Sequence, residues 1–213
     1  MELERRDLAF EADDELVVEQ RADGRAVIRG YAVVYNRLSL DLGGFRERIL
    51  PGAFDKMLSR QRGRRDLVSY FNHNPDILLG RESSGTLKVF SDDKGVGFEV
   101  SPPATRADVL ELVGRRDVKG ASFAFTVDKG GESFTTDESG RAIREIREAQ
   151  MYELGPVVTP AYPSTSAAVA MRSYEAWLAA QSEQPEPAAL AVERTALRGV
   201  AAAWAAILRL RGA

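Results

Sequence analysis

The 213-residue chain has no cysteine and a single histidine, His73. The lack of cysteine excludes disulfides, thiol nucleophiles and cysteine-bound zinc. One imidazole cannot build a metal site from several histidines. We therefore expect no metal and no cofactor. If the chain is an enzyme, its chemistry has to come from hydroxyl, carboxylate, imidazole and backbone groups.

The chain also lacks a large excess of charge of either sign, and it lacks long apolar runs. The 29 basic and 32 acidic residues are interspersed and give a formal net charge of −3, which argues against a general nucleic-acid binder. No apolar run is long enough to cross a bilayer, and residues 1–15 lack the apolar segment of a secretory signal. The composition predicts a soluble cytoplasmic protein with no nucleic-acid or membrane partner.

Hydrophobic residues make up 44% of the chain, enough for one domain with a core. β-Branched and aromatic runs between turn residues predict strands, whereas apolar residues at helical spacing predict helices. The predicted strands are 15–20, 24–36, 66–71, 86–91, 95–100, 121–127 and 146–158, and 128–140 reads as a polar loop. The predicted helices are 51–61 and 105–116, the second with Thr105 as its N-cap.

These elements predict a mainly β (α+β) domain with a few helices over residues 10–181. Residues 1–9 read as an N-terminal extension. The segment 182–189 is rich in proline and polar residues and reads as a linker. Residues 190–213 are rich in alanine and leucine and predict an amphipathic helical tail.

A serine and the one histidine are the residues that could carry chemistry. In a strand over 121–127, Ser122, Ala124 and Thr126 share a face that is small and faintly polar. Serine is a poor nucleophile unless a base removes its proton, and His73 is the only imidazole available.

A base of this kind needs an orienting group that fixes its tautomer and stabilises the imidazolium. Glu145, Glu148 and Glu153 are the candidates. In an unbroken strand Glu148 and Glu153 point to opposite faces, so only one of them can reach the histidine unless a β-bulge intervenes. These residues by themselves leave the choice open.

Five segments occur in an order that resembles the prohead proteases of tailed phages, over residues 10–172. They are "GYAVVYN", "ILPGAF", "FNHNPDILLGR", "KGASFAF" and "YELGPVVTPAYPSTSA". These phage enzymes are similar to herpesvirus assemblin, a serine protease whose β-barrel is surrounded by helices. The resemblance implies that fold here, with His73 as base and Ser122 as nucleophile. Many relatives have glycine where this chain has Ala124.

In the assemblin type the third catalytic residue follows the serine on a later strand, and viral relatives have a second histidine there. Glu148 follows Ser122 by 26 residues, and this spacing favours it as the carboxylate that replaces that histidine. Glu153 is the competitor, since "YELGPV" belongs to the family pattern.

The resemblance also implies a function and partners. It predicts a capsid-maturation endopeptidase that works inside the assembling procapsid in the host cytoplasm. Its substrates would be the scaffolding protein or the scaffold-like N-terminal part of the major capsid protein, and the protease itself; self-association is left open. The alternative is a catalytically silent assembly or scaffolding protein that uses the same barrel to bind partners. The presence of all three candidate residues argues against it.

Overall fold

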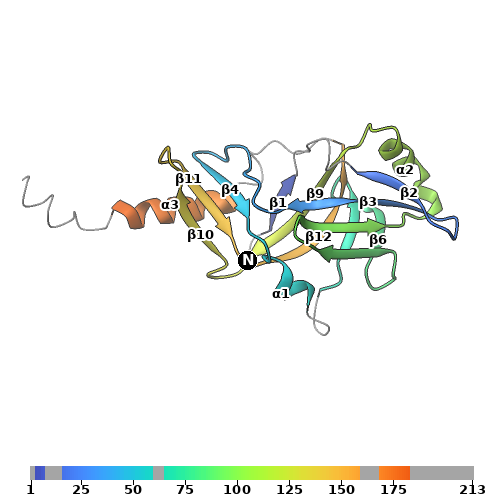
Figure 1. Cartoon of the computed structure of the whole chain (residues 1–213), viewed down its shortest axis with the longest axis horizontal. Coiled ribbons are helices and arrows are strands. Elements are labelled where there is room, and N and C mark those ends of the chain that lie inside the picture. Colours follow the sequence, from blue (N-terminus) through green and yellow to red (C-terminus); the bar gives the residue numbers. More distant parts are fainter. Residues whose placement is uncertain (1–2, 8–15, 60–64, 159–167, 183–213) are drawn as a thin grey trace, which may run out of the picture. The chain divides into compact units, whose positions relative to one another are not determined.

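The computed structural model describes residues 3–7, 16–59, 65–158 and 168–182. Within them the chain is mainly β, as the sequence predicts (Figure 1). The strands are β1 (Glu4–Asp7), β2 (Val17–Gln20), β3 (Ala26–Val34), β4 (Phe45–Ile49), β5 (Val68–Phe71), β6 (Asn74–Arg81), β7 (Leu87–Ser91), β8 (Gly95–Val100), β9 (Gly120–Val127), β10 (Glu132–Thr136), β11 (Ala142–Ile146) and β12 (Ala149–Val157). The helices are α1 (Asp55–Leu58), the 3₁₀ helix η2 (Ala104–Arg106), α2 (Ala107–Gly114) and α3 (Ala168–Ser182).

The strands form three sheets. One has the order β1-β9-β12-β5-β6, the second β2-β3-β8-β7 and the third β10-β11-β4. The resemblance predicts a β-barrel. Among the described strands, the structure has three separate sheets instead, and they do not close into one ring. β9 pairs antiparallel with β1 on one side and with β12 on the other. It is an interior strand of its sheet.

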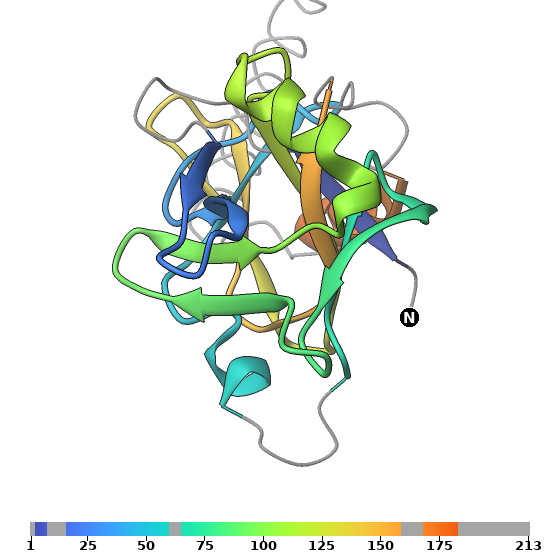
Figure 2. The same cartoon turned by 90° about the vertical axis from the view of Figure 1, so that its right-hand side faces the viewer.

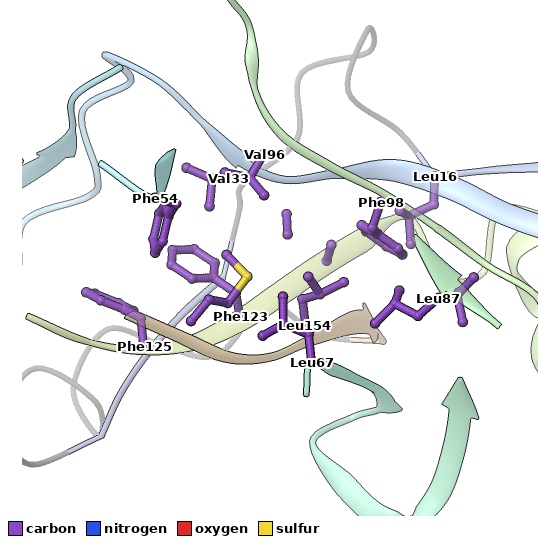
Figure 3. Packing of buried hydrophobic residues seen from close by; sticks show 14 of the residues in the cluster. Leu16, Val33, Phe54, Leu67, Leu87, Val96, Phe98, Phe123, Phe125 and Leu154 are labelled. Carbon is purple, nitrogen blue, oxygen red and sulfur yellow. The ribbon is translucent and has the colours of Figure 1, made fainter. Parts of the chain in front are cut away.

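The apolar core lies between the sheets that contain β3 and β9. Figure 3 shows Val33 and Phe98 facing Phe123 and Leu154, with Phe54 beside them. The rings of Phe54 and Phe123 meet edge to face, with centroids 6.1 Å apart and an interplanar angle of 88°. Burying each large side chain contributes about 1.5–3 kcal/mol. This packing gives β9 a rigid support from one face.

The two helices predicted in this region are present but shorter. α1 covers only Asp55–Leu58 of the predicted 51–61 segment. In α2 the N-cap is Arg106, without a side-chain hydrogen bond, because Thr105 lies inside η2. The expectation of a Thr105 cap was therefore wrong. In both views α1 and α2 lie on opposite sides of the sheets (Figures 1 and 2).

Five strands were not predicted as such: β1, β4, β6, β10 and β11. Residues 4–7, assigned from sequence to an extension, form β1 at the edge of the first sheet. β10 lies in the segment predicted as a loop, and β4 and β11 pair in parallel in the same small sheet. β1, β4 and β11 place charged residues where a strand would normally bury apolar ones.

These buried charges form one group with the half-buried Glu132 of β10. We call this group the charged cluster: Glu4, Arg6, Glu47, Glu132 and Arg144. Arg144, only 1% exposed, donates from Nη1 to Glu4 Oε2 and Glu47 Oε2, each at 2.7 Å. Arg6 Nε donates to Glu47 Oε1 at 2.8 Å. Burial would raise the pKa of Glu47, but Arg6 and Arg144 hold it below its usual value. The cluster attaches β1 to β4 and β11.

The C-terminal part of the described chain is α3. The chain divides into two compact units within this helix, residues 1–174 and 175–213. In the first unit, the ring of Tyr174 packs on Phe45 and Phe134, with centroids 5.0 and 5.8 Å away. Beyond α3, the predicted linker and helical tail lie outside the described residues and stay predictions. Of the helices in the described ranges, none has the length and apolarity needed to cross a membrane.

Candidate active site

His73 lies in a two-residue turn between β5 and β6. Phe71 pairs with Asn74 across this hairpin, and the φ angles of Asn72 and His73 are 52° and 57°. Two successive positive φ angles are typical of a type I′ turn, whose second position usually holds glycine. A histidine in this conformation costs about 1–3 kcal/mol, and such strain clusters at functional sites.

The hairpin tip is tied to β12. The Asn72 amide donates to the Pro156 carbonyl at 3.0 Å, and the Val158 amide donates to Asn72 Oδ1 at 2.9 Å. β5 and β12 also pair in parallel. The imidazole of His73 is thus held at a fixed place over the sheet.

Ser122 lies in the interior of this sheet on β9. The predicted alternation is present: Phe123 and Phe125 enter the apolar core, whereas Ser122 and Ala124 face the other way. Ser122 is 0% exposed, so the small, faintly polar face that it shares with Ala124 is enclosed.

Gly155 of β12 lies opposite Ser122 in the pairing of β9 and β12. A Cβ atom at this position would lie 2.0 Å from the Tyr70 carbonyl oxygen of β5. Glycine is therefore needed for β12 to approach β5 this closely. The close approach keeps the strand that carries Ser122 near the hairpin that carries His73.

A β-bulge in β12 decides which glutamate reaches the histidine. The register against β9 shifts between Met151 and Glu153, which places Glu153 opposite Ala124. Glu153 thereby joins the face of the sheet that carries Ser122. Its carboxylate Oε1 lies 2.8 Å from His73 Nδ1.

Glu148, the glutamate favoured by sequence spacing, is not at the site. It precedes β12, and its Oε1 accepts a hydrogen bond from Lys56 Nζ at 2.5 Å in an exposed surface pair. Glu145 bonds Arg48 in the small sheet instead. The expectation that Glu148 lies beside His73 is therefore corrected: the structure places Glu153 there, because Glu148 lies before the start of β12, whereas Ser122 pairs with Gly155 near the other end of that strand.

Three side chains therefore form a continuous chain of hydrogen bonds. His73 Nε2 lies 2.6 Å from Ser122 Oγ, and His73 Nδ1 lies 2.8 Å from Glu153 Oε1. An ionised carboxylate can only accept, so Nδ1 carries the proton and Nε2 of the neutral ring is free to accept one from the serine. This is the arrangement that general-base activation of a hydroxyl requires.

The N-terminal strand β1 contacts two of these three residues. The Ser122 hydroxyl can donate its one hydrogen to the Arg6 carbonyl oxygen, 3.0 Å from Oγ, instead of to His73 Nε2. Arg5, 49% exposed, places Nε 3.5 Å from the same Glu153 oxygen that His73 contacts. Sequence reasoning missed both arginines because they lie in a segment without apolar alternation. The "ERRD" stretch offered no signal for a strand.

Comparison with known proteins adds a family. Residues 14–179 match the model of the caudovirus prohead serine protease family. No curated protein and no solved structure matches significantly. The matched region contains Ser122, His73 and Glu153 and covers most of the chain. The chain therefore belongs to the caudovirus prohead serine proteases, the serine peptidases of phage capsid maturation.

Proposed function

We propose that this protease cuts peptide bonds with a Ser122–His73–Glu153 triad. The observation that carries the proposal is the unbroken chain of contacts from Ser122 Oγ through both imidazole nitrogens to Glu153 Oε1. The enclosed position of the carboxylate supports it further, because a buried acceptor holds one tautomer of the imidazole.

The proposed reaction is acyl transfer. His73 Nε2 takes the proton of Ser122 while Oγ attacks the carbonyl carbon of the scissile peptide bond. The resulting imidazolium donates from Nδ1 to Glu153 and then passes its Nε2 proton to the leaving amine. Water, activated by the same histidine, hydrolyses the acyl-enzyme. An orienting carboxylate of this kind contributes about 10⁴-fold to the rate.

The proposed substrates are the scaffolding protein or the scaffold-like N-terminal part of the major capsid protein, and the protease itself. The reaction would take place inside the assembling procapsid in the host cell. Family membership supports this assignment. The cluster of three correctly spaced polar side chains disfavours the alternative of a silent scaffolding protein, since binding alone does not require it.

An activated serine can be tested directly. The full chain is incubated for hours with a fluorophosphonate, and the modified residue is located by peptide mass spectrometry. We expect one adduct, on Ser122, which is absent from Ser122→Ala and His73→Ala variants with normal circular dichroism. A folded wild-type chain that never reacts at Ser122 would contradict the proposal and favour the silent scaffold.

A further inference from the structure

Ser122 is enclosed, although the nucleophile of a protease has to be reached by a substrate peptide. The serine is 0% exposed, whereas the His73 side chain keeps 18% of its surface exposed. An endopeptidase has to bring an extended peptide against the nucleophile. Whatever covers Ser122 in this structure therefore has to move before a substrate can be cut.

β1 is the element that lies along the strand of the nucleophile. It pairs antiparallel with β9, with Asp7 opposite Ser122, Arg6 opposite Phe123 and Arg5 opposite Ala124. Extended peptides commonly bind proteins in this way, as an added strand at a sheet edge. Without β1, β9 would itself be the edge of the five-stranded sheet.

The backbone of β1 also competes for the proton of the nucleophile. The Ser122 hydroxyl has one hydrogen, and the Arg6 carbonyl oxygen and His73 Nε2 are both within hydrogen-bond distance, at 3.0 and 2.6 Å. While the hydroxyl donates to Arg6, it cannot transfer its proton to the base.

The side chains of β1 alternate as those of a bound peptide would. Arg6 reaches Glu47 through two hydrogen bonds, at 2.8 and 3.0 Å. Glu4 receives two from Arg144, at 2.7 and 2.9 Å. Arg5 faces the other way, toward Glu153. β1 also lies outside residues 14–179, the part of the chain that matches the family.

We propose that the edge of β9 beside Ser122 is the peptide-binding site of this protease and that residues 4–7 occupy it in cis. The inference rests on the proposed function. Glu47 is then the subsite for a basic residue whose carbonyl lies at Ser122, and Arg144 the subsite for an acidic residue two positions earlier. Residues 4–7 must leave before a substrate peptide can bind.

The geometry also explains why the occupying strand blocks the site without being cut there. The hydroxyl of Ser122 is hydrogen-bonded to the oxygen of the Arg6 carbonyl, whereas acylation requires Oγ to approach the carbonyl carbon with its proton directed to His73. β1 is thus held by the charged cluster in a bound but unreactive position.

The test uses the full chain, so that it folds with β1 present. A recognition sequence for a foreign site-specific protease replaces part of residues 8–15. After cutting, gel filtration removes the N-terminal peptide, and intact mass confirms its loss. The uncut chain is one control, and a chain with a scrambled recognition sequence, treated identically, is the other.

The readout is the rate constant for fluorophosphonate labelling of Ser122. We expect the rate constant to rise at least about tenfold after release. Only chains whose site is unoccupied can react, so the apparent rate is proportional to the unoccupied fraction. A capped peptide with the sequence of residues 3–8 should suppress labelling again. The same peptide with glutamate in place of Arg6 should suppress it far less, because it would meet Glu47 with a like charge.

An unchanged or lower rate in the cut chain would overturn the inference and make β1 a support of the active site. Reactivity absent before and after the cut would contradict the proposed function itself. Hydrogen exchange gives a second test on the unmodified chain and needs no cut. Labelling of Ser122 should increase exchange at residues 4–7 and at the β9 amides that pair with β1, but not along β12. Undiminished protection of residues 4–7 would also overturn the inference.

Discussion

The two faces of β9 differ in what they do, although they belong to one strand. On one face lie the small side chains of Ser122 and Ala124. There His73 contacts both Ser122 and Glu153 through its two ring nitrogens. On the other face Phe123 and Phe125 stack, with centroids 5.1 Å apart, inside the apolar core.

The second face continues from the apolar core into the charged cluster. The guanidinium of Arg6 lies 5.5 Å from the centroid of the Phe125 ring, and from there ion pairs lead to Glu47 and Arg144. Period-two alternation thus separates the catalytic residues from the buried core and the charged cluster across one backbone. Substitutions on the first face should change rate far more than stability. Substitutions on the second should lower stability strongly, in addition to any effect on peptide binding.

The largest effect is expected from Ser122→Ala. Removal of the nucleophile should lower peptide cleavage by about 10⁶-fold. Stability should fall by only about 1 kcal/mol, since a hydroxyl and its hydrogen bonds are lost without leaving a cavity. Cleavage assays and thermal melts measure both. A variant that melts far below wild type would show that this face also carries stability.

A large stability effect is expected from Arg144→Ala. The substitution removes one member of a buried ion-pair network and leaves the buried Glu4 and Glu47 to share Arg6, at a cost of about 3–5 kcal/mol. The matched control is Arg21→Ala, which breaks the exposed pair with Glu99 and should cost about 0–1 kcal/mol. Urea unfolding compares the two. Equal losses would mean that the cluster contributes no more than a surface pair.

The charged cluster should also make stability depend on acid pH. The pKa of Glu47 is lower in the folded protein than its ordinary value of 4.5. The stability this shift contributes is therefore fully present above about pH 4.5 and is lost as the pH falls toward the folded value. Melting temperatures of wild type and Glu47→Gln should differ at pH 7 and converge below pH 4.5. A difference that is constant with pH would contradict the shift.

The smallest effect is expected from Glu148→Gln. The exposed pair of Glu148 with Lys56 should contribute about 0–1 kcal/mol, which is the range for surface ion pairs. The cleavage rate should stay at the wild-type level. Lys56→Ala should reproduce both results. A strong loss of activity in either variant would return Glu148 to the site.

The contrast between apolar and charged inward residues also explains which strands could be predicted from the sequence. β3, β5, β8 and β9 were predictable because they are runs of β-branched and aromatic residues between turns, with mostly apolar residues at their inward positions. β1, β4 and β11 place Arg6, Glu47 and Arg144 at such positions. A charged residue in sequence is indistinguishable from a surface residue until its partners, far away in the chain, are known.

The candidate site, too, could be predicted only in part. His73 and Ser122 could be selected because each is chemically distinctive and lies in a recognisable motif. The third residue depended on a single bulge between Met151 and Glu153, which shifts the register by one and leaves no mark in residue spacing. The contact of Ser122 with the Arg6 carbonyl involves the backbone, so no side-chain pattern could predict it.

The most direct test of the triad compares Glu153→Gln with Glu148→Gln in the same peptide-cleavage assay. Glu153→Gln should reduce kcat by about 10⁴-fold with little change in KM and a nearly normal melting temperature, because a glutamine cannot stabilise the imidazolium of His73. Glu148→Gln should match wild type. Activity of Glu153→Gln within tenfold of wild type, or the reverse ranking of the two variants, would contradict the account.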